Sequence, residues 1–312
     1  MKYTGLLQRL ARFVMPSYAV MAFVYLGFVL WLPVSQSALD SYQLTNSAYR
    51  VILLAIAIPT LVVWFTAFLG YSKLLDYAAA IKSAKEGRHF IKLAEGAAWL
   101  AWSLPVPTLI GLILNAVASH ISGFHATSII LSNYINLILP LIAFTIISTA
   151  TRGLFVQSKL NYNIISSRVI TLFFVVTGVL FCYLTFRRFD LSSLSSTHNP
   201  YFLPIWLMVL TVTVPYLYIW FVGLLGAYEL TIYSRNTQGV IYRQALTYLA
   251  FGLAAVIFSS IAQQYLNSVQ PRTGHLVIDY RIIANLIFRI LGGVGFVVMA
   301  LGAIRLKKIE EV

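Results

Sequence analysis

The sequence predicts an all-α integral membrane protein with eight transmembrane helices, arranged as two similar four-helix units with both termini in the cytoplasm. Three observations lead to this fold class: a charge-poor composition, eight long apolar runs, and a motif that occurs twice. Hydrophobic residues make up 60% of the 312 residues and charged residues only 10%, whereas a soluble domain carries roughly 25% charged residues. A soluble core cannot hide this much apolar surface, so lipid is the expected solvent.

The apolar runs set the number of predicted helices. A helix needs roughly 20 apolar residues to cross the hydrocarbon core of a bilayer. Eight runs approach or exceed this length: 13–34, 51–71, 97–118, 128–149, 169–186, 203–227, 245–266 and 282–304. They lack the alternation of apolar and polar residues that marks the strands of a membrane barrel. The first run is longer than the core of a signal peptide, which predicts a retained helix.

The basic residues between the runs predict the orientation. With the N-terminus inside, the inner segments hold 16 Lys and Arg residues and the outer segments hold five. Cytoplasmic loops carry such an excess, so both ends are expected inside. The net charge of +13 therefore reflects membrane insertion, and we expect no nucleic-acid partner. The sequence contains no Asn-x-Ser/Thr acceptor, which is consistent with a bacterial plasma membrane.

An internal duplication predicts how the helices are grouped. Residues 58–70 (IPTLVVWFTAFLG) and 214–226 (VPYLYIWFVGLLG) are identical at six of thirteen positions, including a proline and a tryptophan. Shorter matches pair LNAV at 114–117 with LNSV at 266–269, and NLI at 136–138 with NLI at 285–287. We therefore expect a first repeat over 1–156 and a second over 157–312. Each holds an even number of spans, so a pseudo-two-fold axis along the membrane normal should relate them.

One charged residue, Arg289, lies well inside a predicted span. A charge at the centre of a bilayer costs roughly 2.5–3.5 kcal/mol on insertion scales, so Arg289 is expected to face the bundle. It shares a helix face with Asn285, Gly292 and Gly293, and glycines let a second helix approach closely. Arg289 then either binds an anionic solute or is structural. In the structural alternative it extends to the outer surface, or donates to carbonyls freed by Pro140.

Asparagines occupy matching places in the two predicted repeats. The pairs are Asn115 with Asn267 and Asn136 with Asn285, and Asn133 lies one turn before Asn136. Amide side chains in a membrane hydrogen-bond across helices. Two roles stay open: the asparagines line a central, outward-facing substrate cavity, or they only hold helices together.

Prolines predict kinks in three spans. Pro59 and Pro215 lie near the middle of the second and sixth spans, and Pro140 lies in the fourth. Proline removes a backbone donor and clashes with the preceding turn. The kinks are candidate hinges, although membrane helices also tolerate prolines that only shape the bundle.

The longest inner segment, residues 72–96, carries a basic pattern. Lys82, Lys85, Arg88 and Lys92 recur every three to four residues with apolar residues between them. This spacing is typical of an amphipathic helix on anionic lipid at the cytoplasmic face. The alternative is the ordinary positive charge of an inner loop.

Missing motifs narrow the function classes. No Asp or Glu lies inside a predicted span, and no nucleotide-binding, hydrolase or zinc-protease motif occurs. We therefore expect no enzyme, no metal and no cofactor. Two classes remain: a permease or channel for a small solute, with an anion favoured by Arg289, or a non-catalytic subunit or anchor of a larger membrane complex. A third, weaker alternative is a sensor that acts through a partner. The expected partners, besides the lipid bilayer, are other membrane subunits or further copies of this chain in a homo-oligomer.

Overall fold

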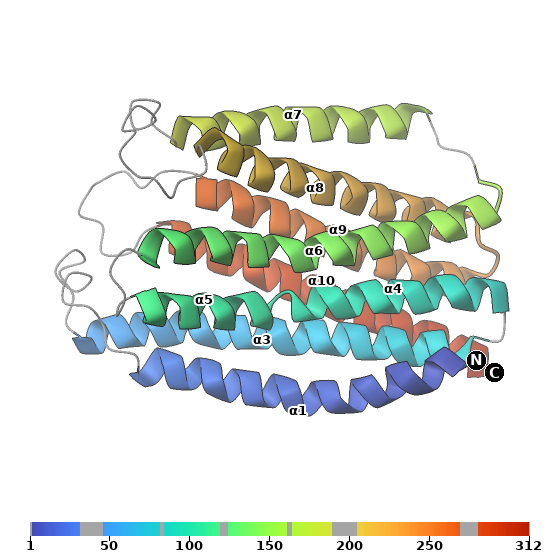
Figure 1. Ribbon diagram of the computed structural model, residues 1–312. Coiled ribbons are helices and arrows are strands. Elements are labelled where there is room, and N and C mark those ends of the chain that lie inside the picture. The colour runs from blue at the N-terminus through green and yellow to red at the C-terminus, as the bar shows by residue number, and fades with distance from the viewer. Residues whose placement is uncertain are drawn as a thin grey trace.

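The computed structural model describes residues 2–31, 46–81, 84–118, 124–160, 164–188, 205–268 and 280–311. All regular structure within these ranges is helical: α1 (Lys2–Trp31), α3 (Asn46–Ala80), α4 (Ala84–Trp102), α5 (Pro105–Ala118), α6 (Phe124–Gln157), α7 (Ile164–Arg188), α8 (Ile205–Asn236), α9 (Val240–Ser268) and α10 (Tyr280–Glu311). The helices run side by side, and both termini lie at one end of the bundle (Figure 1). We call this end the terminal end.

The helices confirm an all-helical membrane protein for the described residues. Every predicted apolar run overlaps helical structure. Six stretches are long and apolar enough to cross a membrane: Leu53–Ala80, Glu86–Leu114, Tyr134–Gln157, Thr211–Asn236, Val240–Gln263 and Leu286–Glu311. Within the described side chains, α1 and α7 contribute the shorter apolar stretches Pro16–Trp31 and Arg168–Tyr183.

Six helices form a closed ring. In order around the ring, α3 packs on α4, α4 on α6, α6 on α8, α8 on α9, α9 on α10, and α10 on α3 again. Outside the ring, α1 packs on α3 and α5, and α7 packs on α8 and α9. Figure 1 shows α1 and α7 on opposite edges of the bundle. The interior of the ring is therefore enclosed by helices from both halves of the chain.

The third predicted run is interrupted. The structure ends α4 at Trp102 and begins α5 at Pro105. Pro105 has no N–H group to donate to the carbonyl of Ala101, so the helical ladder stops there. The hydroxyl of Tyr18, on α1, donates to this same Ala101 carbonyl. The amide of Leu104 also donates to this carbonyl over 3.4 Å. The tertiary hydrogen bond from Tyr18 holds α1 against the break.

The basic segment leads into a helix that enters the bundle, and its binding to anionic lipid stays a prediction. Residues from Ala84 onward belong to α4, which continues into the bundle and packs on α3 and α6. Phe90 and Leu93, on the apolar face, are buried, so protein covers that face. Arg88 and Lys92 remain exposed. Lys82 and the side chain of Lys85 lie outside the described residues.

The three predicted hinge prolines do not interrupt their helices. Pro59 lies inside α3, Pro140 inside α6 and Pro215 inside α8, and each helix continues on both sides of its proline. Their use as hinges stays a prediction.

Glycines bring α9 and α10 into backbone contact. A Cβ atom added to Gly252 would lie 2.5 Å from the carbonyl oxygen of Gly295, and one added to Gly295 would lie 2.7 Å from the carbonyl oxygen of Gly252. A third glycine, Gly302, sits equally close to the carbonyl of Ala245. Small residues permit such approach in membrane bundles, where packing rather than the hydrophobic effect holds helices together.

Candidate functional site: polar clusters inside the helical ring

Arg289 forms a polar cluster with α1 and α3. Its Nη1 donates to the hydroxyl of Thr60 over 2.8 Å, and that hydroxyl donates to the carbonyl of Ile56 over 2.8 Å. Thr60 is 2% exposed and follows the internal proline of α3. Tyr25, buried on α1, interacts with both Thr60 and Arg289. The charge is therefore held between helices rather than directed at lipid.

The position of Arg289 along α10 places it within the bundle. It lies nine residues after Tyr280, the first residue of α10, which is about 14 Å along the helix. Gly293, one turn later, packs against Val63 and Thr66 of α3, so the two helices meet closely beside the guanidinium. The hydrogen-bond partner of the Arg289 guanidinium is Thr60. Among the described residues, α10 packs most extensively on α9 and α3.

Four of the five predicted asparagine side chains lie outside the described residues. Asn115, Asn133, Asn267 and Asn285 lie on α5, α6, α9 and α10, and their side chains fall outside the described residues. Asn136 is exposed on α6. The proposed asparagine-lined cavity stays a prediction.

A buried carboxylate, Glu229, was missed at the sequence level. The predicted run stopped at residue 227, but α8 continues to Asn236, and Glu229 is 0% exposed. Its Oε2 accepts a hydrogen bond of 3.2 Å from Thr151, and its Oε1 lies 3.6 Å from Nη1 of Arg152. Glu229 follows Gly226 by three residues, and positions i and i+3 share a helix face. This spacing was the sequence signal that Glu229 lies on the same face as Gly226.

A second network crosses the ring near the terminal end. The hydroxyls of Tyr77 on α3 and Tyr242 on α9 lie 3.0 Å apart. Tyr233 on α8 donates to Oε1 of Glu86 on α4 over 3.5 Å, and a side-chain hydrogen bond between Tyr233 and Tyr242 joins the two pairs. Neither α3 and α9 nor α4 and α8 are neighbours in the ring. These side chains therefore bridge its interior.

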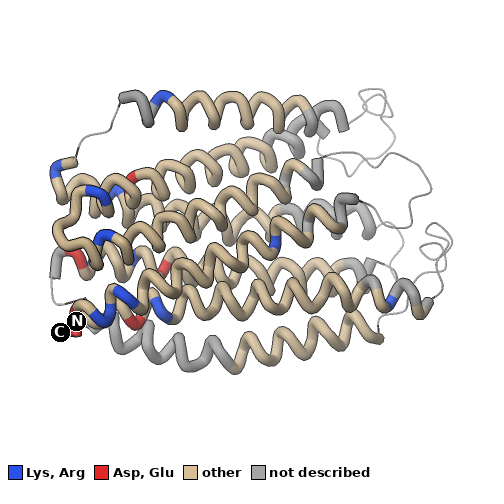
Figure 2. Tube along the Cα trace, turned by 180° about the vertical axis from the view of Figure 1, so that it is seen from behind, with Lys and Arg blue, Asp and Glu red and all other residues tan. Residues whose placement is uncertain are grey.

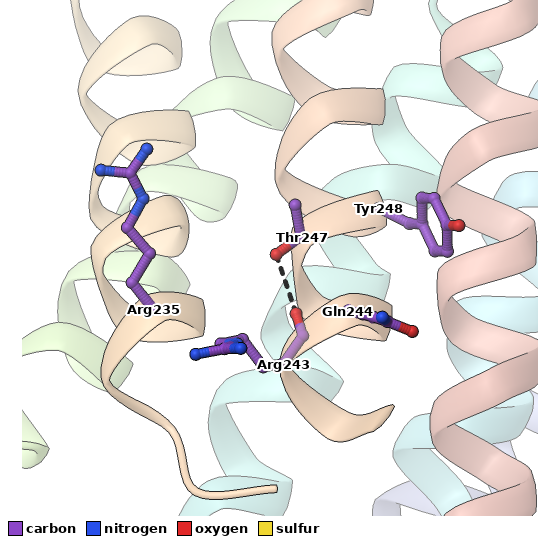
Figure 3. Close-up of a pocket in the computed structure, with 5 residues that line it drawn as sticks. All are labelled: Arg235, Arg243, Gln244, Thr247 and Tyr248. Atoms are coloured by element: carbon purple, nitrogen blue, oxygen red, sulfur yellow. Dashed lines mark hydrogen bonds between the residues drawn. The ribbon is translucent and has the colours of Figure 1, made fainter. Parts of the chain in front are cut away.

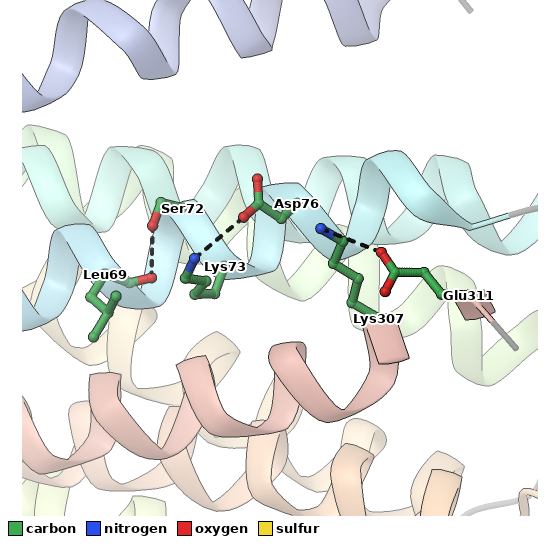
Figure 4. A network of polar contacts seen from close by, with 6 residues as sticks. All are labelled: Leu69, Ser72, Lys73, Asp76, Lys307 and Glu311. Atoms are coloured by element: carbon green, nitrogen blue, oxygen red, sulfur yellow. Dashed lines mark hydrogen bonds and ion pairs between the residues drawn. The ribbon is translucent and has the colours of Figure 1, made fainter. Parts of the chain in front are cut away.

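The bridging network differs from the polar contacts on the outside of the bundle. Figure 4 shows two ion pairs, Lys73 with Asp76 on α3 and Lys307 with Glu311 on α10. Each joins residues of one helix, at 3.6 Å and 3.5 Å, and all four side chains are at least 38% exposed. Exposed pairs of this kind contribute about 0–1 kcal/mol to stability. Residues that connect non-neighbouring helices are the better candidates for function.

The described residues contain no group of three or more His, Cys, Asp or Glu side chains placed to hold a metal ion. Cys182 of α7 is a free, partly exposed cysteine. No family model, no curated protein and no solved structure matches the chain.

Proposed function

We propose that this protein is not an enzyme but a permease or channel for a small anionic solute, closed in this conformation at the terminal end. The observation that carries the proposal is the charged side chain of Arg289, held inside a candidate membrane span by Thr60. Ionisable residues at this depth are costly in lipid and commonly mark substrate pathways. A guanidinium has five N–H donors, so one bond to Thr60 leaves donors for an anion.

The proposed architecture has eight spans in two parallel repeats, with both termini in the cytoplasm. The pattern of helix packing supports it: α3 packs on α1, α4 and α10, while α8 packs on α7, α9 and α6. Aromatic contacts at matching places in the two repeats add support. The ring centres of Tyr25 and Trp64 lie 5.1 Å apart, and those of Phe181 and Trp220 lie 4.7 Å apart. Charged residues gather at the terminal end (Figure 2), as expected for a cytoplasmic side. The pseudo-axis would then pass through the ring.

In this proposal the bridging network is the gate at the terminal end. A solute that moves along the ring interior must separate Tyr77 from Tyr242 and Tyr233 from Glu86. A typical hydrogen bond contributes only about 0.5–1.5 kcal/mol net, so such a network can open and close at a small cost. The phenol rings also fill space, since Tyr77 and Tyr233 are 0% and 5% exposed.

Anion flux through liposomes tests the role of Arg289. We expect purified protein to carry at least one anion from a panel of chloride, nitrate, phosphate and lactate. Arg289→Ala should lower that flux at least tenfold, and Arg289→Lys should retain part of it because the charge remains. Arg88→Ala, which removes an exposed arginine, is the matched control. If folded Arg289→Ala carries every transported anion at the wild-type rate, Arg289 has no transport role.

The gate is tested by removing hydroxyls without removing rings. The double variant Tyr77→Phe/Tyr242→Phe should raise the flux several-fold, because the closed state loses the bond between α3 and α9. Tyr134→Phe is the control, since Tyr134 bonds Thr211 over 2.6 Å between the ring neighbours α6 and α8. Equal flux in the double variant, the control and the wild type would refute the gate.

The second candidate function is a non-catalytic subunit or anchor, and α7 favours it. Apolar side chains are exposed along this helix, among them Val169, Leu172, Val176 and Val179 at 56–66%, and α7 packs at the edge of the ring on α8 and α9. Another membrane protein could cover this surface. Native mass spectrometry after gentle release from the membrane separates the two functions. A stoichiometric second polypeptide indicates a subunit or sensor, and a lone chain that transports anions indicates a permease.

A further inference from the structure

A basic pocket lies at the terminal end of α8 and α9. Its volume is about 430 Å³, and it is lined by Arg235 of α8 and by Arg243, Gln244, Thr247 and Tyr248 of α9. Figure 3 shows Arg243 extending from α9 toward α8, which carries Arg235. The hydroxyl of Thr247 donates to the carbonyl of Arg243 over 2.8 Å, so this hydroxyl is anchored to the helix backbone.

The pocket is surrounded by positive charge that the described part of the chain does not neutralise. A third arginine, Arg305 of α10, stacks its guanidinium 4.6 Å from the ring centre of Tyr248. The ion pairs among the described residues are Lys73 with Asp76, Arg152 with Glu229 and Lys307 with Glu311, and none of them uses the three arginines. The pocket therefore suits an anion with several acceptor oxygens.

One residue that lines the pocket, Gln244, lies on the same face of α9 as an apolar stripe on the outside of the bundle. Gln244, Phe251 and Phe258 recur at seven-residue spacing on α9, which is close to two helical turns and puts them on one face. Phe251 is 66% exposed and Phe258 is 47% exposed. Gly252, on another face of α9, packs against α10. The side chains of the stripe thus face away from the helical ring, toward the surrounding lipid.

We propose that this pocket binds the phosphate headgroup of an anionic phospholipid, with the acyl chains along Phe251 and Phe258. Basic pockets between membrane helices on the cytoplasmic side are known to suit such headgroups. A free phosphate ion would satisfy the arginines but would not use the apolar stripe. The site is separate from Arg289 and does not depend on the proposed transport function.

Lipid titrations monitored by native mass spectrometry test the site. The whole protein in neutral detergent is titrated with phosphatidylglycerol, with phosphatidylcholine and with inorganic phosphate. We expect wild type to prefer phosphatidylglycerol, and Arg235→Gln/Arg243→Gln to lower that affinity about 30-fold, since each arginine near an anionic lipid contributes about one kcal/mol. Lys159→Gln/Arg168→Gln removes the same charge from exposed residues near α6 and α7 and should leave the affinity within about twofold.

Two further variants keep the result interpretable. Arg235→Lys/Arg243→Lys retains the charge and should recover most of the binding. Gln244→Glu introduces a carboxylate into the pocket without removing an arginine, and should weaken phosphatidylglycerol binding several-fold. Equal losses for the pocket pair and the control pair would overturn the site, because binding would then follow total charge. Displacement of the bound lipid by millimolar inorganic phosphate would overturn a lipid site in favour of a phosphate site.

Discussion

Gly252→Leu is expected to destabilise the protein strongly, because it forces apart the backbones of α9 and α10. A Cβ at this position would lie 2.5 Å from the Gly295 carbonyl oxygen, 2.5 Å from Cγ of Met299 and 2.8 Å from its amide nitrogen. Two of these atoms belong to the α10 backbone, so a rotamer change cannot relieve the clash and the helices must separate. We expect a loss of about 3 kcal/mol or more, measured as reversible thermal or denaturant unfolding in detergent.

Gly27→Leu is the matched control for this prediction. A Cβ at Gly27 of α1 meets no atom within 4 Å, and both substitutions replace a poor helix former with a good one. Gly27→Leu should therefore leave the unfolding midpoint unchanged or slightly higher, and Gly252→Ala should already lower it. If Gly252→Leu unfolds at the wild-type midpoint, the close approach of α9 and α10 is wrong.

Arg152→Gln is expected to have the second-largest effect on stability. This change removes the guanidinium 3.6 Å from Oε1 of Glu229, whose side chain is 0% exposed while that of Arg152 is 59% exposed. Taking the cation from a buried carboxylate costs about 3–5 kcal/mol when both partners are buried. The exposure of Arg152 weakens the pair, so we expect a loss of about 2 kcal/mol in the free energy of unfolding.

The double variant Arg152→Gln/Glu229→Gln distinguishes a lost ion pair from a general packing defect. Neutralising the buried carboxylate removes the charge that needs a partner, so the double variant should be more stable than Arg152→Gln alone. Lys73→Gln, which breaks the exposed pair with Asp76 (Figure 4), should change stability by less than about 0.5 kcal/mol. A double variant no more stable than Arg152→Gln would show that charge at Glu229 is not the cause.

The features that arise from the local cost of exposing polar groups to lipid could be predicted from the order of the residues. Backbone groups in a membrane must be satisfied within the helix, so long apolar runs already specify helices and their approximate positions. The sequence also predicts that the charged side chain of Arg289 faces protein rather than lipid, because hydrocarbon solvates the charge poorly.

Which residues contact one another across the bundle depends on how the helices pack. Tyr77 and Tyr242 are 165 residues apart in the chain, and only the closed ring brings their hydroxyls together. Thr60 as the partner of Arg289, and Tyr18 as the donor to the Ala101 carbonyl, likewise follow from how the helices pack. From the sequence, Glu229 lies just after the end of an apolar run. In the structure, α8 extends beyond it and Thr151 of α6 donates to its carboxylate. Hydropathy describes how well each segment is accommodated in lipid. A hydrogen bond across the helical ring depends on how two separate helices are rotated about their axes and positioned along the membrane normal.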